Sequence, residues 1–333
     1  MSVQFSKGLE DVIADQTSIS NVEGDLGRLS YRGYTIEQLV TLSFTRVVWL
    51  VLFGELATAE QEQQLEKYLQ ANGELSDSEL NILAALPRQL HTMRMLQSMI
   101  PVLDTTPKGA QDLPFTNKEG YRGLAVVAKI PTLLASFRRL QLNDKLPVFN
   151  ASKPYLDNFL SMFHAKDASA DHIRCLEMLQ ILQLEHSFNA GTFTLRVAAS
   201  TLSPVESALS SAVGSLYGTL HGGADEAALN EAIKVGTPAN ARAYVVDLLA
   251  NKGRLMGMGH REYTKLDPRA AILKPMAEKL CKGTDFENVF LTLKEKGKDI
   301  STSYKYVSNF GLTLGLPLDE ARSEEHTSEL QSL

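Results

Sequence analysis

The chain has 333 residues, of which 44% are hydrophobic, and its 33 basic and 39 acidic residues give a net charge of −6. These values are typical of a soluble globular protein, and the mild acidity without blocks of like charge argues against nucleic acid or a membrane surface as the main partner. The two cysteines, Cys175 and Cys281, form no CxxC pattern, so we expect neither a disulfide framework nor a zinc cluster, and a reducing, cytoplasmic compartment fits best.

No segment predicts a secretory signal or a membrane anchor. Residues 1–10 lack a basic segment followed by an apolar run. The longest apolar run, Val47 to Phe53, has seven residues, far fewer than the roughly 20 needed to cross a bilayer. It predicts a buried helix, within a pattern of apolar residues at helical spacing from Thr35 to Glu55 and again from Thr58 to Leu69.

Helix signals continue in the second half of the chain, whereas the alternating patterns of strands are scarce. Ser203-Pro204-Val205-Glu206 predicts a capping box, with proline at the first helical position, for a helix rich in small residues that runs to Leu220. Further helices are predicted from Thr237-Pro238 to near Gly253, and from Asp267-Pro268 toward Lys282. The sequence therefore predicts an all-α protein.

The last twelve residues, 322–333, differ in character from everything before them. They resemble a translated sequencing adapter, so they are excluded from the fold prediction. We expect them to be a non-native tail and the natural C-terminus to be missing.

Three histidines lie in small or glycine-rich surroundings. They occur in Glu185-His186-Ser187-Phe188-Asn189-Ala190, in His221-Gly222-Gly223-Ala224-Asp225, and in Gly257-Met258-Gly259-His260-Arg261-Glu262-Tyr263, which runs on to Asp267-Pro268-Arg269-Ala270. Neutral histidine donates a hydrogen bond without a charge that burial would penalise, and arginine grips carboxylates in bidentate fashion. No HExxH or comparable ligand spacing occurs, so no metal site is predicted.

The order of these motifs resembles citrate synthase. The resemblance extends back to Ser18-Ile19-Ser20, Glu23-Gly24-Asp25-Leu26-Gly27 and Tyr31-Arg32-Gly33-Tyr34, and forward to about Pro317. It implies an all-α, two-domain homodimer with a large helical domain at residues 1–224, a small helical domain at residues 225–309 that closes over a cleft, and a return to the large domain at residues 310–321. A family member would continue for several more helices.

The resemblance also implies an acyltransferase that condenses acetyl-CoA or propionyl-CoA with oxaloacetate and releases CoA, in the tricarboxylic acid or methylcitrate cycle. His221 would stabilise the enolate oxygen of the thioester, and His260 would polarise the oxaloacetate carbonyl. His186 and Arg269 would bind oxaloacetate. Coenzyme A, as a substrate and with no other cofactor, would contact a group of residues in one loop: Leu255, Met256, Gly257, Met258, Gly259 and Lys265.

Local sequence alone leaves structural roles open for each histidine. His221 could cap a helix C-terminus beside a glycine stop. His186, placed in a helix that ends near Asn189, could be a buried histidine bonded to a neighbour, and His260 could belong to a basic turn.

The resemblance fails at the catalytic base. Counting back from Gly315-Leu316-Pro317 places Tyr304 where the family has an aspartate, and tyrosine, with a reference pKa of about 10, is a poor base at neutral pH. Asp299 could substitute only after a five-residue shift. Three hypotheses follow: a true synthase with a truncated or corrupted end, which we favour; a divergent enzyme with another base; and a catalytically silent acyl-CoA or dicarboxylate binder.

Overall fold

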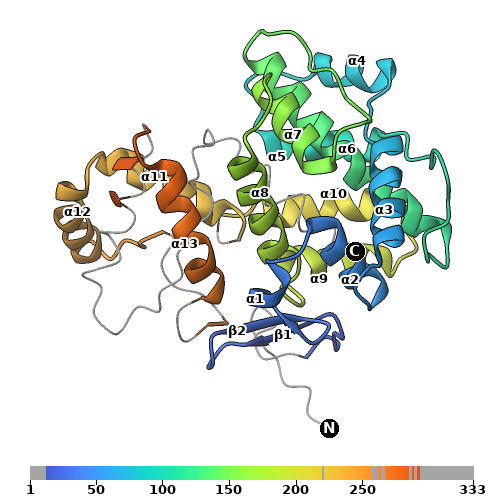
Figure 1. Cartoon of the computed structure of the whole chain (residues 1–333). Helices are drawn as coiled ribbons and strands as arrows, with labels where there is room; N and C mark the ends of the chain where they lie inside the picture. The colour runs from blue at the N-terminus through green and yellow to red at the C-terminus, as the bar shows by residue number, and fades with distance from the viewer. Residues whose placement is uncertain are drawn as a thin grey trace.

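The computed structural model describes residues 13–219, 221–256, 262–263, 267–284, 287–288 and 291–292. In chain order the helices are α1 (Ile36–Leu39), α2 (Phe44–Phe53), α3 (Ala59–Asn72), α4 (Asp77–Ala85), α5 (Thr92–Met99), the 3₁₀ segment η2 (Ile100–Val102), α6 (Lys118–Gln141), α7 (Tyr155–His164), α8 (Ala170–Gln183), α9 (Ala190–Ala199), α10 (Val205–Leu216), α11 (Gly223–Val235), α12 (Pro238–Ala250) and α13 (Pro268–Cys281). Figure 1 shows α1 to α10 as the larger group of helices, with α11, α12 and α13 together at its side.

A small antiparallel sheet precedes the helices, and the sequence analysis did not predict it. Strands β1 (Ser20–Glu23), β2 (Arg28–Tyr31) and β3 (Tyr34–Thr35) pair in the order β1-β2-β3. The turns need left-handed residues, which Gly27 (φ 64°) and Gly33 (φ 87°) supply without steric cost. The strands are too short to show a clear alternation, which explains why the pattern was missed.

The pattern from Thr35 to Glu55 is two helices, not one. Helix α1 ends at Leu39, and α2 begins at Phe44. Between them, the Thr41 hydroxyl donates to the Gln38 carbonyl oxygen at 2.7 Å, so a side chain satisfies a carbonyl that a continuing helix would use. The prediction that Val47 to Phe53 is a buried helix is confirmed, since five of these seven residues are buried.

Helix α6 is the longest described helix and crosses the core of the larger group. It contains Pro131, which lacks an N–H and cannot donate to the Val127 carbonyl four residues earlier. The Tyr155 hydroxyl of α7 donates to that carbonyl oxygen instead, at 2.8 Å. A tertiary hydrogen bond thus replaces the missing helical one and joins α6 to α7.

The predicted capping box of α10 is wrong. Pro204 is the N-cap residue rather than the first helical residue, and the Ser203 hydroxyl donates to the Ala198 carbonyl oxygen at 3.0 Å. Glu206 accepts from Thr105 and, at 2.7 Å, from Arg122, so tertiary partners take the carboxylate that would have closed the box. The helix also ends at Leu216, earlier than the predicted Leu220.

Helix α13 joins the smaller group to the larger one by packing on α8. Its buried residues Ala277 and Cys281 form a cluster with Cys175 of α8. The predicted helix starts at Thr237-Pro238 and Asp267-Pro268 are confirmed by α12 and α13. In the part of the chain that the structure describes, no helix is both long and apolar enough to cross a membrane.

Candidate active site

His186 lies in the loop between α8 and α9. Helix α8 ends at Gln183, so the prediction that His186 belongs to a helix ending near Asn189 is wrong; Asn189 is the N-cap of α9, where its side chain accepts from the Thr192 amide at 2.9 Å. The chain reverses through Ser187, which has a φ of 61°. A left-handed residue at this point cannot continue a right-handed helix.

A buried carboxylate holds this loop to the N-terminal sheet. Glu185, 3% exposed, accepts from the Ser20 hydroxyl of β1 at 2.8 Å and from the Ser187 amide at 2.6 Å. The Ser187 amide also lies 2.9 Å from the Ser20 hydroxyl oxygen. Burial raises the pKa of Glu185 above its usual range, although these hydrogen bonds oppose the shift.

Tyr263 contacts the His186 side chain. Its hydroxyl oxygen lies 3.1 Å from Nε2 of His186, the two rings are edge to face with centroids 5.5 Å apart, and Tyr263 is fully buried. Burial raises the pKa of Tyr263 far above 10, with nearby Arg269 opposing the shift, so the hydroxyl keeps its proton at neutral pH.

Arg269 sits at the start of α13 and is held by Asp267, the N-cap residue of that helix. Nε of Arg269 lies 3.0 Å from both carboxylate oxygens of Asp267, and Nη2 lies 2.6 Å from Oδ2. Burial would lower the pKa of Arg269, but the adjacent carboxylate more than offsets this and raises it. The guanidinium is therefore a fixed cation, with its orientation set by a carboxylate that is 1% exposed.

Tyr31 of β2 completes this group. Its hydroxyl donates to the Leu182 carbonyl oxygen at 3.0 Å, and its charge environment includes Arg269, Glu185 and Tyr263. Burial raises the pKa of Tyr31 well above 10, so it also stays protonated. The structure thus brings together residues from the sheet, the loop after α8 and the start of α13, which we call the His186–Arg269 cluster: Tyr31, Glu185, His186, Tyr263, Asp267 and Arg269.

His221 lies in the turn between α10 and α11. Its amide donates to the Gly218 carbonyl oxygen at 2.9 Å, and its carbonyl accepts from the Ala224 amide at 2.9 Å. Burial lowers its pKa below 6.5, so the ring is neutral at pH 7. Glycine is needed at position 222 for a structural reason, in addition to the predicted close approach of a ligand. A Cβ there would lie 2.9 Å from the Leu216 carbonyl oxygen.

The predicted coenzyme A loop is only partly described. Leu255 is buried in a cluster with Val245, and the Met256 amide donates to Oε1 of Glu231 on α11 at 3.4 Å. The remaining predicted residues of this loop, and His260, lie outside the described residues: Gly257, Met258, Gly259 and Lys265.

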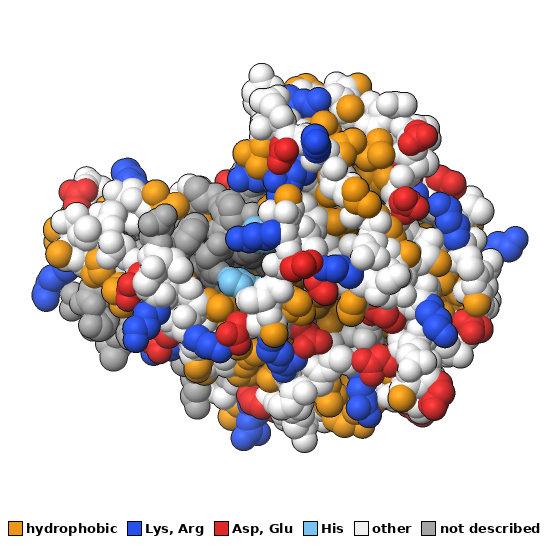
Figure 2. Space-filling view, turned by 45° about the horizontal axis from the view of Figure 1, so that its top comes forward, with side chains coloured by type: hydrophobic (Ala, Val, Ile, Leu, Met, Phe, Trp, Pro, Cys, Tyr) orange, Lys and Arg blue, Asp and Glu red, His pale blue; other side chains and the backbone are white. Residues whose placement is uncertain are grey.

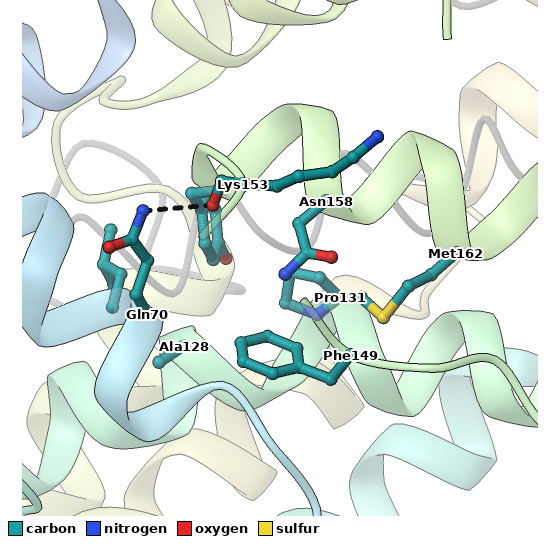
Figure 3. Close-up of a pocket in the computed structure, with 9 residues that line it drawn as sticks. Gln70, Ala128, Pro131, Phe149, Lys153, Asn158 and Met162 are labelled. Carbon is teal, nitrogen blue, oxygen red and sulfur yellow. Dashed lines mark hydrogen bonds between the residues drawn. The ribbon is translucent and has the colours of Figure 1, made fainter. Parts of the chain in front are cut away.

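The surface between the two groups of helices is hollowed, and histidine atoms line it (Figure 2). A separate pocket of about 220 Å³, partly open to solvent, lies between α3, α6 and α7, where the Gln70 amide donates to the Lys153 carbonyl oxygen at 3.1 Å (Figure 3). None of the predicted site residues lines this second pocket. Among the described residues, no group of three or more histidine, cysteine or acidic side chains is arranged to hold a metal ion.

Four residues of the site lie within the sequence motifs, but the sequence alone predicted no role for them: Ser20, Tyr31, Glu185 and Tyr263. Tyr263 stands three residues after His260, yet it contacts His186, which is 77 residues away along the chain. The sequence does place an acidic or aromatic residue near each motif histidine of this region, as Glu185 stands beside His186 and Tyr263 follows His260. Only the fold shows which of them meet.

An all-α protein that holds a histidine and an ion-paired arginine together beside a hollow between two groups of helices has the features of an enzyme that binds an anionic substrate. The family model described as "Citrate synthase, C-terminal domain" matches residues 8–313. The chain therefore belongs to the citrate synthase family, which is a family of acyltransferases.

The most similar relatives include citrate synthases and 2-methylcitrate synthases. The chain is 33% identical over 279 residues to a citrate synthase of Saccharolobus solfataricus, covering 83% of this chain and 73% of that one. It is 37% identical over 281 residues to a citrate synthase of Synechocystis sp., covering 83% and 70%. It is 34% identical over 304 residues to 2-methylcitrate synthase 1 of Corynebacterium glutamicum, covering 88% and 79%.

Solved structures share the fold. The citrate synthase of Thermotoga maritima superposes with a TM-score of 0.87 at 27% identity, covering 98% of this chain and 89% of that one. The citrate synthase of Thermoplasma acidophilum, solved as a ternary complex with carboxymethyl coenzyme A and oxaloacetate, superposes with a TM-score of 0.89 at 27% identity, covering 98% of this chain and 90% of that one. The predicted all-α, two-domain fold is confirmed.

Proposed function

We propose that this protein condenses an acyl-CoA, acetyl-CoA or propionyl-CoA, with oxaloacetate and releases CoA. The observation that carries the proposal is the His186–Arg269 cluster. Two residues expected to bind oxaloacetate, one in the loop after α8 and one at the start of α13, share Tyr263 as a neighbour. A partly buried, fixed cation beside a histidine suits a ligand that carries carboxylates.

His221 is the proposed donor to the enolate oxygen of the acyl thioester. A neutral ring can donate a hydrogen bond where charge develops without the penalty of a buried cation. The lowered pKa of His221 supports this role at pH 7. His260, which lies outside the described residues, is the proposed donor to the oxaloacetate carbonyl, and the loop from Leu255 to Gly259, with Lys265, is the proposed contact for coenzyme A.

The proposal includes the arrangement of the molecule. Residues 1–224 would form the large domain, residues 225–309 the small one, and residues 310–321 a return to the large domain. The boundary falls in the first turn of α11, which begins at Gly223. The protein would act as a homodimer in the cytoplasm, with coenzyme A as a substrate and no further cofactor.

The test is the release of free thiol from acetyl-CoA or propionyl-CoA, followed with a thiol reagent, when oxaloacetate is added. We expect release from the purified chain, and His221→Ala should lower it about 10²- to 10³-fold, as for other lost donors to a developing oxyanion. Unchanged circular dichroism would show that the variant folds. If His221→Ala released thiol as fast as the parent protein, the proposed role of His221 would be overturned.

Tyr304 favours a second candidate, a catalytically silent binder of acyl-CoA or dicarboxylates, because it stands where the family has its aspartate base. A silent binder takes up oxaloacetate, measured by calorimetry, but releases no thiol. Tyr304→Asp separates the two candidates: restoring a base should raise release by about 10²- to 10⁴-fold in a chain whose other groups are in place. A variant that binds oxaloacetate and still releases no thiol would favour the binder.

A further inference from the structure

We infer that Tyr263 is a positioning residue for His186, and that its hydroxyl fixes the tautomer of this proposed ligand-binding histidine, with the proton on Nδ1. The inference rests on the proposed function for the identity of the ligand, which is oxaloacetate. It rests on the structure alone for the contact between the two side chains.

The hydrogen bond has a preferred direction. The neutral imidazole nitrogen is a much stronger acceptor than a phenol oxygen, and a phenol O–H is a stronger donor than an imidazole N–H. The 3.1 Å contact between Tyr263 and Nε2 of His186 is therefore an O–H donating to nitrogen. With Nε2 accepting, a neutral His186 carries its proton on Nδ1.

Charge around the pair is mixed. Arg269 opposes the rise in the pKa of Tyr263, whereas Asp267 and Glu262 add to it. Glu185 lies on the other side of the loop, but its carboxylate is directed to Ser20 and to the Ser187 amide. Only a neutral imidazole has a ring nitrogen that can accept from the Tyr263 hydroxyl.

Tyr263 can do this because its own backbone is fixed from the N-terminal sheet. Gly24, in the turn between β1 and β2, lies so close to Glu262 that an added Cβ would overlap the Glu262 carbonyl oxygen. The same sheet holds the other partner, since Ser20 of β1 bonds Glu185 beside His186. The sheet therefore supports both ends of the hydrogen bond.

The first test is Tyr263→Phe, which removes one hydroxyl and keeps the ring. The control is Tyr34→Phe, the same change at a residue of β3 that is 38% exposed. Nitrogen NMR of histidine-labelled protein at pH 8 reports the state of each ring, and a spectrum of His186→Gln assigns the signal of His186. We expect Nε2 to be unprotonated in the parent protein and the two tautomers to mix in Tyr263→Phe, with no change in Tyr34→Phe.

Calorimetry then measures ligand binding. Loss of one hydrogen bond should raise the Kd for oxaloacetate by about 3- to 10-fold in Tyr263→Phe and leave the Kd for coenzyme A within about 2-fold. A parent protein with the proton on Nε2, or a variant whose His186 signals do not move, would overturn the positioning role. A parent protein that binds no oxaloacetate would overturn the proposed function instead, and the NMR result would still decide the role of Tyr263.

Gly24→Ala provides a second route if Tyr263→Phe does not fold. The added methyl group must displace Glu262 and with it Tyr263, so the His186 signals should shift in the same direction as in Tyr263→Phe. Signals identical to those of the parent protein would contradict the support assigned to the sheet.

Discussion

Glu185 is the residue whose ionisation bears most directly on the stability of the site. Its folded-state pKa is raised by burial, so its charged form is destabilised by folding and its contribution worsens as pH rises from the unfolded pKa, about 4.3, through the folded one. Glu185→Gln keeps an oxygen that can accept from Ser20 and Ser187. We expect the variant to be more stable than the parent protein at pH 7.

The gain should disappear as pH falls toward the unfolded pKa of the carboxyl, because the parent side chain is then protonated in both states. Urea denaturation at a series of pH values between 4 and 7.5 measures the difference. A variant that is less stable than the parent protein at pH 7 would show that the charge is favourable where it lies, contrary to the direction of the pKa shift.

Lys129 and Glu79 form a buried pair at the residue scale, each with 2% of its side chain exposed and 2.6 Å between Nζ and Oε1. Glu79 also accepts from the Asp104 amide at 2.9 Å. Lys129→Met should lower the free energy of unfolding by about 3–5 kcal/mol at pH 7, since it leaves a buried charge without its cation. The double variant with Glu79→Gln should recover part of that loss in urea denaturation; no recovery would assign the loss to packing.

Residue identity alone could predict part of the site. Arg269 and the three histidines were recognisable because their motifs are local, and the helix starts at Thr237 and Asp267 were recognisable because a proline follows each. The tautomer of His186 was not predictable, since its partner Tyr263 is distant in sequence. The roles of the predicted site residues stay predictions, and His260 lies outside the described residues.

At the scale of elements, α6 and α7 depend on a hydrogen bond that local sequence cannot reveal. The Val127 carbonyl has no donor at position 131, because that residue is proline, and it accepts from Tyr155. Tyr155→Phe keeps the stacking on Phe44, with ring centroids 6.1 Å apart, but leaves the carbonyl unsatisfied. We expect a loss of about 1–3 kcal/mol in the free energy of unfolding.

The same substitution made in a Pro131→Ala background should cost less, because the new N–H at position 131 can donate to Val127. Thermal and urea denaturation of the four proteins in this cycle give the coupling between the two positions. An equal cost in both backgrounds would contradict the replacement of the helical hydrogen bond by the tyrosine.

Element boundaries were predicted less well than the elements themselves. At the break between α1 and α2 the Thr41 side chain bonds the Gln38 carbonyl oxygen, and at the start of α10 Glu206 bonds partners that are distant in sequence. In both places a polar side chain forms a hydrogen bond that the local sequence pattern does not predict. The small sheet was missed for a different reason, since its strands are too short for a period to appear.

For the whole molecule, the contact between α13 and α8 is one of the places where the smaller group of helices meets the larger one. Ala277 is fully buried there, in a cluster with Cys175 and Cys281. Ala277→Leu should force the two helices apart and destabilise the protein by about 1–3 kcal/mol. Arg269 lies on the same helix, so we expect weaker oxaloacetate binding as well.

Hydrogen exchange locates the effect. Amides of α13 should exchange faster in Ala277→Leu, whereas those of α6, which lies in the core of the larger group, should keep their protection. Faster exchange throughout the protein would indicate general destabilisation and would argue against a local role for this contact.

Gly24 of the N-terminal sheet lies so close to the Glu262 backbone that it leaves no room for a side chain. This contact joins two parts of the chain that are far apart in sequence. During synthesis, the N-terminal sheet leaves the ribosome long before the segment that it must touch. Contacts between such distant parts of a chain form slowly, because the intervening loop has to be closed first. The helices of the larger group can fold while translation continues, but the proposed substrate site has to be among the last parts of the protein to assemble.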